Sequence, residues 1–325
     1  SALTANLFGN RNIAIGSNAL DANTTASFNI GIGHNALTAN STGTENVGIG
    51  QDALAANTAD DNTGVGFQAL ETNSTGADNT AFGHNALQAN TTASNNVAIG
   101  SGAADANTTG AQNTAVGQGA LTTNTTGSHN TALGRSALLS ATTADYNTAV
   151  GSGAMDTTST GTQNVAVGYK AMDANTTGNY NVAVGYNALD ANSTANSNTA
   201  VGHSALTANT TAANNVALGK DSLYSNTTGS ENTAVGTEAM YGNTTAANNT
   251  AVGYYALRTN STGANNVAVG FGSLDANTTA NNNTAVGFSA LTANTTGTLN
   301  TAVGAGAAQS NETGGAITAV GKDAG

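Results

Sequence analysis

The residues best suited to chemistry in this sequence are four histidines, and their spacing keeps them apart. The sequence repeats with a period of 17 residues, and we number each copy from its leading asparagine, as in Asn181. His34, His84 and His203 then occupy position six, and His129 occupies position 17. If each copy is one coil of stacked strands, the nearest equivalent pair is three copies or ~14 Å apart. Because metal ligands must surround one ion, we predict solvated histidines and no metal site.

Nucleophilic catalysis and cofactor binding have no better basis. No serine or threonine is spaced to meet a histidine and a carboxylate, as an acyl-transfer site requires. The repeated glycine precedes no helical pattern, so it predicts no phosphate-binding loop. The chain has no cysteine, which removes disulfides and thiolate ligands and leaves the redox compartment undetermined. We therefore expect no enzymatic activity and no cofactor.

One acidic row is more suggestive. Asp156, Asp173 and Asp190 occupy position ten of successive copies, which would stack carboxylates ~4.8 Å apart. A bound cation would relieve the repulsion between like charges. The glycine-rich motif of calcium-binding β-rolls is absent, however. A solvated acidic stripe is the favoured interpretation, and a cation site is the alternative.

Composition excludes several classes of partner. The net charge is -12 with only six Lys and Arg, whereas nucleic-acid binding requires a basic surface. No apolar run approaches the ~18 to 20 residues of a membrane span, so we expect no membrane insertion. Because the chain begins at Ser1 in the middle of a copy, we expect a piece of a longer protein.

The repeat itself predicts the fold. Glycine occupies position five in all 19 copies, position three is Ala or Gly, and position four is large and apolar. Position eight is Ala or Ser, and position nine is usually Leu or Met. A fixed period of this length is typical of a solenoid. We predict one repeat domain over residues 1–325, with a partial copy at 1–11, full copies from 12 and a partial last copy at 317–325.

The composition of one copy favours strands over helix, because Asn, Thr, Gly and β-branched residues are poor helix formers. Positions two to four predict a short strand, and positions eight and nine a second one. Glycine at position five and the Asn-Thr corner at positions 12 to 15 supply the turns. We predict an all-β parallel β-solenoid of about 19 coils, with positions four, eight, nine and sometimes two in the core.

So thin a core favours lateral association between chains. Three or four buried side chains per copy recover less than the ~25 kcal/mol needed to order 17 residues. Small residues at position three would allow another backbone to approach closely, which makes Ala183, Ala200, Ala217 and Ala234 a candidate close-packing interface. The alternative is that a larger residue there would clash inside the same coil.

Aromatic residues form a candidate contact surface. Tyr254, Phe271 and Phe288 occupy position six of consecutive copies, and Tyr169 and Tyr186 form a shorter row. Position six otherwise holds mostly polar residues, so we expect it to face solvent. An exposed aromatic row can contact protein or sugar. The alternative is that the rings stack on one another or pack against a neighbouring chain.

The Asn-Thr corner, as in Asn23-Thr24-Thr25, has three interpretations. The first is a turn in which stacked Asn and Thr side chains bond one another and the backbone. The second is a threonine ladder that binds ice, although the ladder is interrupted at Ala59, where one copy is a residue short. The third is N-glycosylation, because most corners match the acceptor pattern.

The repeat also resembles a known family. Asn181-Val182-Ala183-Val184-Gly185 with Ala188 is similar to the Ser-Val-Ala-Ile-Gly-x-x-Ala repeat of YadA-like head domains. These domains occur in trimeric autotransporter adhesins and related tail-fibre-type proteins, and the resemblance covers essentially the whole chain. It implies a left-handed parallel β-roll, three chains side by side, displayed on a bacterial or phage surface.

We therefore expect a non-enzymatic extracellular fibre segment that adheres through multivalent surface contacts. Its partners would be copies of itself, in a homotrimer or filament, and a protein or glycan of a host surface. An ice-binding solenoid and a passive structural filament, with or without glycans, are the alternatives.

Overall fold

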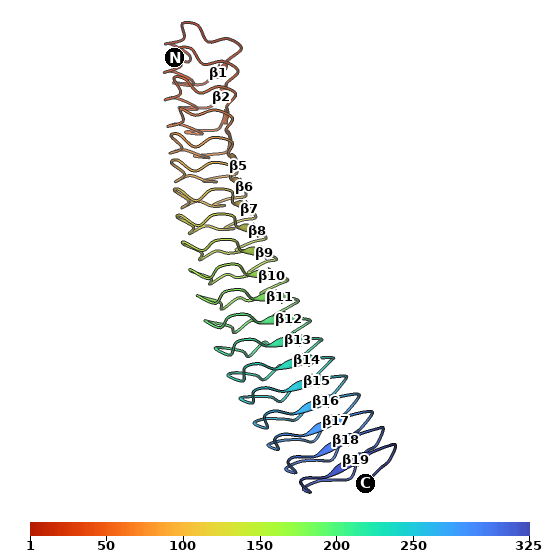
Figure 1. The fold of residues 1–325 in the computed structure, drawn as a ribbon. Helices are drawn as coiled ribbons and strands as arrows, with labels where there is room; N and C mark the ends of the chain where they lie inside the picture. Colours follow the sequence, from red (N-terminus) through yellow and green to blue (C-terminus); the bar gives the residue numbers. More distant parts are fainter. The chain divides into compact units, whose positions relative to one another are not determined.

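The computed structural model describes all residues, 1–325, and the chain is all-β. Its 19 parallel strands form a β-solenoid of about 18 turns with a 17-residue repeat (Figure 1). This confirms the predicted all-β parallel β-solenoid. No helix of the chain is long and apolar enough to cross a membrane.

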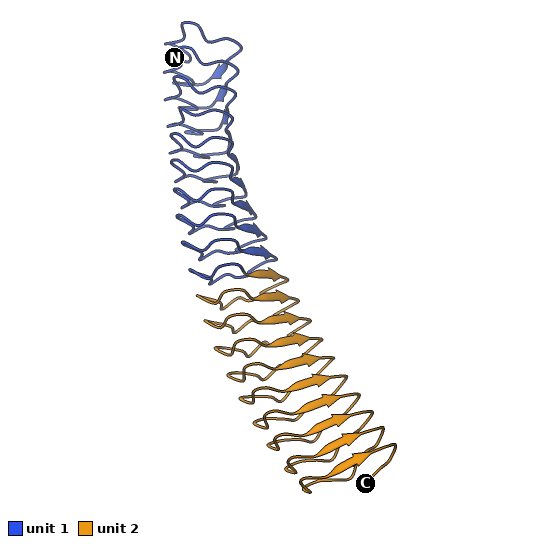
Figure 2. Ribbon diagram, viewed as in Figure 1, with its two compact units in different colours: residues 1–163 blue, residues 164–325 orange.

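The chain divides into two compact units, residues 1–163 and 164–325 (Figure 2). The strands of the first unit are β1 Ile13–Ile15, β2 Ile30–Ile32, β3 Val47–Ile49, β4 Thr63–Val65, β5 Thr80–Phe82, β6 Val97–Ile99, β7 Thr114–Val116, β8 Thr131–Leu133 and β9 Thr148–Val150. Those of the second unit are β10 Val165–Val167, β11 Val182–Val184, β12 Thr199–Val201, β13 Val216–Leu218, β14 Thr233–Val235, β15 Thr250–Val252, β16 Val267–Val269, β17 Thr284–Val286, β18 Thr301–Val303 and β19 Thr318–Val320.

Within each unit, a strand pairs in parallel with the strand of the next copy, and equivalent positions face each other. Ala183 of β11 pairs with Ala200 of β12, for example. The short copy keeps this register, because Val47 pairs with Thr63, only 16 residues further on. The missing residue is therefore absorbed in the corner before Asn62 and not in the sheet.

Each strand turns its middle residue inward, so the core differs from the predicted one. Position three is buried in every strand except β1, while positions two and four are half-buried or exposed, as in Val182-Ala183-Val184. Positions eight and nine, such as Ala188 and Leu189, are fully buried as predicted. The prediction that positions four and two belong to the core is wrong, because alternation along a strand sends both to the face opposite position three.

The predicted second strand is also absent. Positions seven and nine lie in the left-handed region, with φ of 49° at Asn187 and 55° at Leu189. A strand cannot continue through that backbone conformation. The segment instead turns, while the Leu189 N–H donates to the Ala205 carbonyl of the next coil at 2.9 Å.

Glycine is required at position five, as predicted for a turn. Gly185 has φ of 140°, which only glycine adopts readily. A Cβ on Gly185 would lie 2.3 Å from the Gly202 carbonyl oxygen of the next coil. The invariant glycine thus lets the backbones of adjacent coils approach each other.

Two buried rows of asparagine complete the interior. At position one, the Asn198 N–H donates to Asn181 Oδ1 at 2.9 Å, and Asn181 Nδ2 donates to the Ala195 carbonyl at 2.8 Å. At position 12, Asn192 Nδ2 donates to Asn175 Oδ1 at 3.0 Å and to the Ala195 carbonyl at 3.1 Å. The predicted corner in which stacked side chains bond one another and the backbone is therefore confirmed.

The position-12 row is interrupted within residues 1–163. Ala141 and Thr158 stand where neighbouring coils have asparagine, and both are fully buried. Asn124 Oδ1 and Thr158 Oγ1 are buried without a hydrogen-bond partner. Two successive corners of this unit therefore lack the cross-coil amide bond.

Candidate functional site

The outer face of the sheet is an uncharged, largely apolar surface in each unit. It carries the residues at positions two and four of every strand, all of which are Val, Ile, Leu, Phe or Thr. Ile15 and Phe82 are 59% and 58% exposed in the first unit, and Leu218 and Val303 are 46% and 39% exposed in the second. The position-four row is Ile15, Ile32, Ile49, Val65, Phe82, Ile99, Val116, Leu133 and Val150 in residues 1–163, and Val167, Val184, Val201, Leu218, Val235, Val252, Val269, Val286, Val303 and Val320 in residues 164–325.

A continuous row of exposed and half-buried apolar residues of this kind is unusual on a soluble monomer. Single exposed aliphatic residues are common, but long contiguous patches mark surfaces that contact another molecule. All 18 Asp and Glu and all six Lys and Arg lie outside positions two and four. The sheet face therefore combines apolar character with an absence of charge, as the centre of a protein interface does.

The alanines at position three are not part of this surface. Ala183, Ala200 and Ala217, with Ala234, have no exposed surface at all, so the prediction that they form a close-packing interface with another chain is wrong. The reason for their small size lies inside the coil. A Cβ added to the equivalent Gly31 would lie 3.2 Å from Leu20 Cγ of the preceding coil. The alternative, a clash within the solenoid, is the correct explanation.

The predicted aromatic rows are exposed and stacked. Tyr254 and Phe271 have ring centroids 5.5 Å apart at 15°, and Phe271 and Phe288 are 5.2 Å apart at 10°. Tyr169 and Tyr186 stack at 5.4 Å. All five rings are between 42% and 59% exposed, which confirms that position six faces solvent. Their stacking agrees with the alternative interpretation of the rows, and their use as contact sites stays a prediction.

The structure adds aromatic pairs that the sequence argument did not include. His203 continues the second row, with its ring 5.1 Å from that of Tyr186. Tyr224 and Tyr241 stack at 5.0 Å on position ten. Their signal was available in the sequence, because residues at equal positions of consecutive copies are neighbours in the stack.

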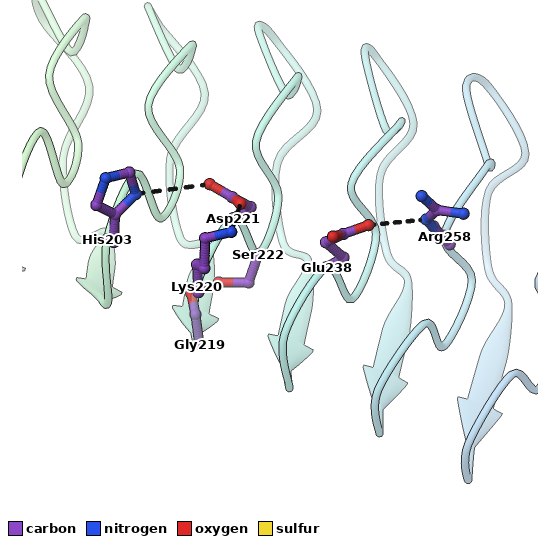
Figure 3. A network of polar contacts seen from close by, with 7 residues as sticks. All are labelled: His203, Gly219, Lys220, Asp221, Ser222, Glu238 and Arg258. Atoms are coloured by element: carbon purple, nitrogen blue, oxygen red, sulfur yellow. Dashed lines mark hydrogen bonds and ion pairs between the residues drawn. The ribbon is translucent and has the colours of Figure 1, made fainter.

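Polar contacts surround these rows in residues 203–258 (Figure 3). His203 Nδ1 lies 3.8 Å from Asp221 Oδ1, and Lys220 Nζ lies 3.1 Å from Asp221 Oδ2. Arg258 Nε donates to Glu238 Oε2 at 2.9 Å. Lys220 and Arg258 are thus each paired with a carboxylate of the same chain.

The three aspartates of the acidic row at position ten do not all lie in the same unit. Asp173 and Asp190 lie in residues 164–325, whereas Asp156 lies in residues 1–163. Burial, and then the Asp173 carboxylate, raise the pKa of Asp190. Asp173 itself pairs with Lys170, whose Nζ is 3.1 Å away. No group of three or more His, Asp or Glu is arranged to hold a metal ion.

The corners show how their hydroxyl and amide groups are used. The asparagine of most corner acceptor patterns, such as Asn23, is buried with its Nδ2 bonded, so these corners offer no free amide to a glycan. Asn311 is half-buried, and Asn248 and Asn282, which begin acceptor patterns outside the corners, are exposed. Position-13 hydroxyls bond the next coil, as Thr108 Oγ1 does with the Thr125 carbonyl at 2.9 Å. Threonine at position 14, such as Thr109, is exposed. The position-14 threonines of successive corners therefore form one row of hydroxyls that is exposed to solvent.

Comparisons with known proteins add no relationship. No protein-family model matches the chain, and no curated protein matches it.

Proposed function

We propose that this chain is a segment of an extracellular fibre, and that copies of it associate side by side through the outer face of the sheet. The observation that carries the proposal is the uninterrupted apolar row at position four, flanked by Val, Ile or Thr at position two. Such a row has no partner within one chain. A second copy supplies an equally long, equally uncharged face with the same spacing.

The energy available from this face is adequate for association. Full burial of a Val, Ile, Leu or Phe side chain is worth ~1.5–3 kcal/mol, so covering a side chain recovers that value in proportion to its exposed fraction. Covering the four exposed position-four residues of residues 1–163, Ile15, Phe82, Ile99 and Leu133, which are 41–59% exposed, would contribute ~3–6 kcal/mol, and the half-buried ones add to it. That is comparable with the ~4–15 kcal/mol lost in translational and rotational freedom, and position two adds to it.

A homotrimer is the arrangement that we propose, and display on a cell or phage surface follows from the same resemblance to YadA-like heads. Three chains packed by their sheet faces would leave the corners and the aromatic rows outward. Weak contacts repeated along each chain and over three chains would then add up to strong adhesion.

The mass of the chain in solution tests this proposal. We expect a species of three times 31.5 kDa for the native sequence. Leu218→Lys combined with Val235→Lys places two charges in the apolar face and should yield monomers, because burying an unpaired charge is costly. Thr228→Lys adds one such charge at an exposed corner and should leave the trimer intact. A monomeric native chain, or loss of the trimer only in Thr228→Lys, would refute the sheet-face interface.

Ice binding is the second candidate, and the exposed position-14 row favours it. Its support is narrower, because the adjacent position-13 hydroxyls already donate to backbone carbonyls and one row remains. A measurement of thermal hysteresis separates the two functions, since a fibre segment without ice affinity produces none. A long polymer in the mass measurement would instead support a passive filament.

A further inference from the structure

The aromatic residues of the chain are concentrated in residues 224–288. Six of the fourteen aromatic residues, from a total of eight Tyr and six Phe, lie there. We propose that this surface is a protein-binding site whose partner contributes uncharged aliphatic and aromatic side chains. The site, called here the Tyr-Arg patch, consists of Tyr224, Tyr241, Tyr254, Tyr255, Arg258, Phe271 and Phe288.

The patch is continuous across positions six, seven and ten. The rings of Tyr254 and Tyr255 have centroids 3.8 Å apart, and the Arg258 guanidinium lies 4.2 Å above the Tyr255 ring. Arg258 follows Tyr241 in the position-ten row, one coil further on. The register therefore places Arg258, and with it Tyr255 and the position-six row, next to the stacked pair of Tyr224 and Tyr241. Tyrosine and arginine are the residues that most often dominate protein-binding surfaces.

The faces of the central rings are already occupied, which argues against a sugar ligand, whereas Phe288 has a stacked ring on one face only. Phe271 lies between Tyr254 and Phe288, with both neighbours nearly parallel to it. Tyr255 has Arg258 over its ring. A sugar or a cation that binds an aromatic residue needs an open face of the ring. The patch offers ring edges and phenol hydroxyls instead, which suit the side chains and carbonyl groups of a protein.

Both cations of the patch region are paired with carboxylates, which favours an uncharged contact. Arg258 is paired with Glu238, and the nearby Lys220 is paired with Asp221 (Figure 3). The further carboxylate near Arg258, that of Asp275, is half-buried, and burial raises its pKa. These pairs border the aromatic residues as a polar rim borders an apolar interface centre. Stacking also restricts the rotamers of the rings before binding, so less side-chain entropy is lost on contact.

This inference rests on the proposed function, because it assumes that the chain works through surface contact, but it concerns a different surface from the sheet face. The probe is a displayed library of random peptides, selected on the immobilised full chain. We expect the selected peptides to be rich in aromatic and aliphatic residues and low in charge. No selection above an inert surface, or selection of mainly charged peptides, would overturn the assignment.

A variant with Tyr241→Thr, Tyr254→Ser and Phe271→Ser then locates the site. Each new residue already occurs at the same position of another copy, as Thr292 and Ser101 do, so the fold should persist. Peptide affinity should fall at least about tenfold, the level expected when anchoring residues are lost.

The matched control removes three exposed aromatic residues outside the candidate contact rows, with Phe67→Ser, Tyr146→Ser and Tyr180→Ser, and should bind as the native chain does. Equal loss in both variants, or no loss in the first, would refute the Tyr-Arg patch. Binding of an oligosaccharide panel that disappears only in the first variant would assign the patch to sugars instead. A change of mass in the first variant would place the patch in the interface between copies, whereas Leu218→Lys with Val235→Lys tests the sheet face separately.

Discussion

Replacing Ala141 by asparagine should restore the buried asparagine row where it is interrupted. Asn124 Nδ2 donates to Asn107 Oδ1 at 2.7 Å, but Asn124 Oδ1 is buried and has no donor. In most intact coils, the next asparagine supplies that donor and also bonds the carbonyl three residues further along the chain, as Asn124 does with Gly127. Asn23 and Asn40 are the exceptions, since the asparagine that follows each bonds only a backbone carbonyl. An asparagine at 141 would make the same two bonds, to Asn124 Oδ1 and to the Ala144 carbonyl.

The expected gain is about 1–2 kcal/mol of local stability. Each new buried hydrogen bond contributes roughly 0.5–1.5 kcal/mol, and satisfying the orphaned Asn124 oxygen removes a penalty of about 1–3 kcal/mol. Ordering the longer side chain costs part of this, on the order of 1 kcal/mol. The backbone at Ala141 has the hydrogen bond that its equivalents make, since the Ala141 N–H donates to the Leu138 carbonyl at 3.3 Å.

Native-state hydrogen exchange is the appropriate assay, because repeat proteins do not unfold in one two-state step. Exchange of amides that bond across this interruption, such as that of Thr142 to the Ser159 carbonyl, should slow by roughly 5–30-fold in Ala141→Asn. Exchange around Asn107 should change much less. Unchanged or faster exchange at Thr142 would show that the asparagine row does not stabilise the coils.

Two further variants test the position-12 asparagine row on either side of Ala141. Thr158→Asn alone can bond within its own corner but lacks an amide oxygen at 141, so its full effect should require Ala141→Asn. The double variant should therefore exceed the sum of the single ones by about 1 kcal/mol, measured as a double-mutant cycle. Asn107→Ala removes an asparagine from the uninterrupted part of the row, and it should destabilise the coils that contain it by about 2–4 kcal/mol.

Three other substitutions test separate features. Ala183→Leu should lower the free energy of local unfolding, measured by hydrogen exchange, by about 1–3 kcal/mol, because position three is closely packed. Val184→Leu, on the outer face, should change this free energy little. Leu299→Asn should raise stability by about 0.5–1 kcal/mol in the same assay, because Leu299 has φ of 61° and asparagine tolerates that region better. Burial raises the pKa of Asp275, so its contribution to stability is greatest at low pH and falls as pH rises through that raised pKa. Asp275→Asn should therefore be stabilising near pH 7, and the difference in melting temperature should vanish below about pH 4.

The period and the turn glycines made the fold predictable, but the orientation of the strand was assigned incorrectly. Large apolar residues usually face a core, so the sequence predicts that position four lies in the interior. A signal against this was present: Val65, Phe82 and Ile99 follow one another at that position. A closely packed interior does not accept such changes of volume between neighbours, whereas an exposed row does. Position three, restricted to Ala or Gly, was the interior position.

The candidate surfaces were predictable to a different extent. Rows at equal positions of consecutive copies, such as Tyr169 and Tyr186, follow directly from the register, and they stack as expected. The Tyr-Arg patch did not follow, because it joins positions six, seven and ten. Tyr255 meets Arg258 across a segment expected to be a strand, and the left-handed residues that turn this segment bring the two side chains together.

The interior and the outer face have the same physical origin. A coil this narrow leaves corner carbonyls away from water, and they need buried donors. Asparagine serves because an identical amide lies one coil away, so each side chain both donates and accepts along the stack. Asn181 and Asn192 can therefore be buried, although isolated amides in an apolar core are costly. The same repetition aligns Val184 with its equivalents outside, where the chain has no partner to offer. The register that pairs the polar groups within one chain thus leaves an apolar outer face for another chain to cover.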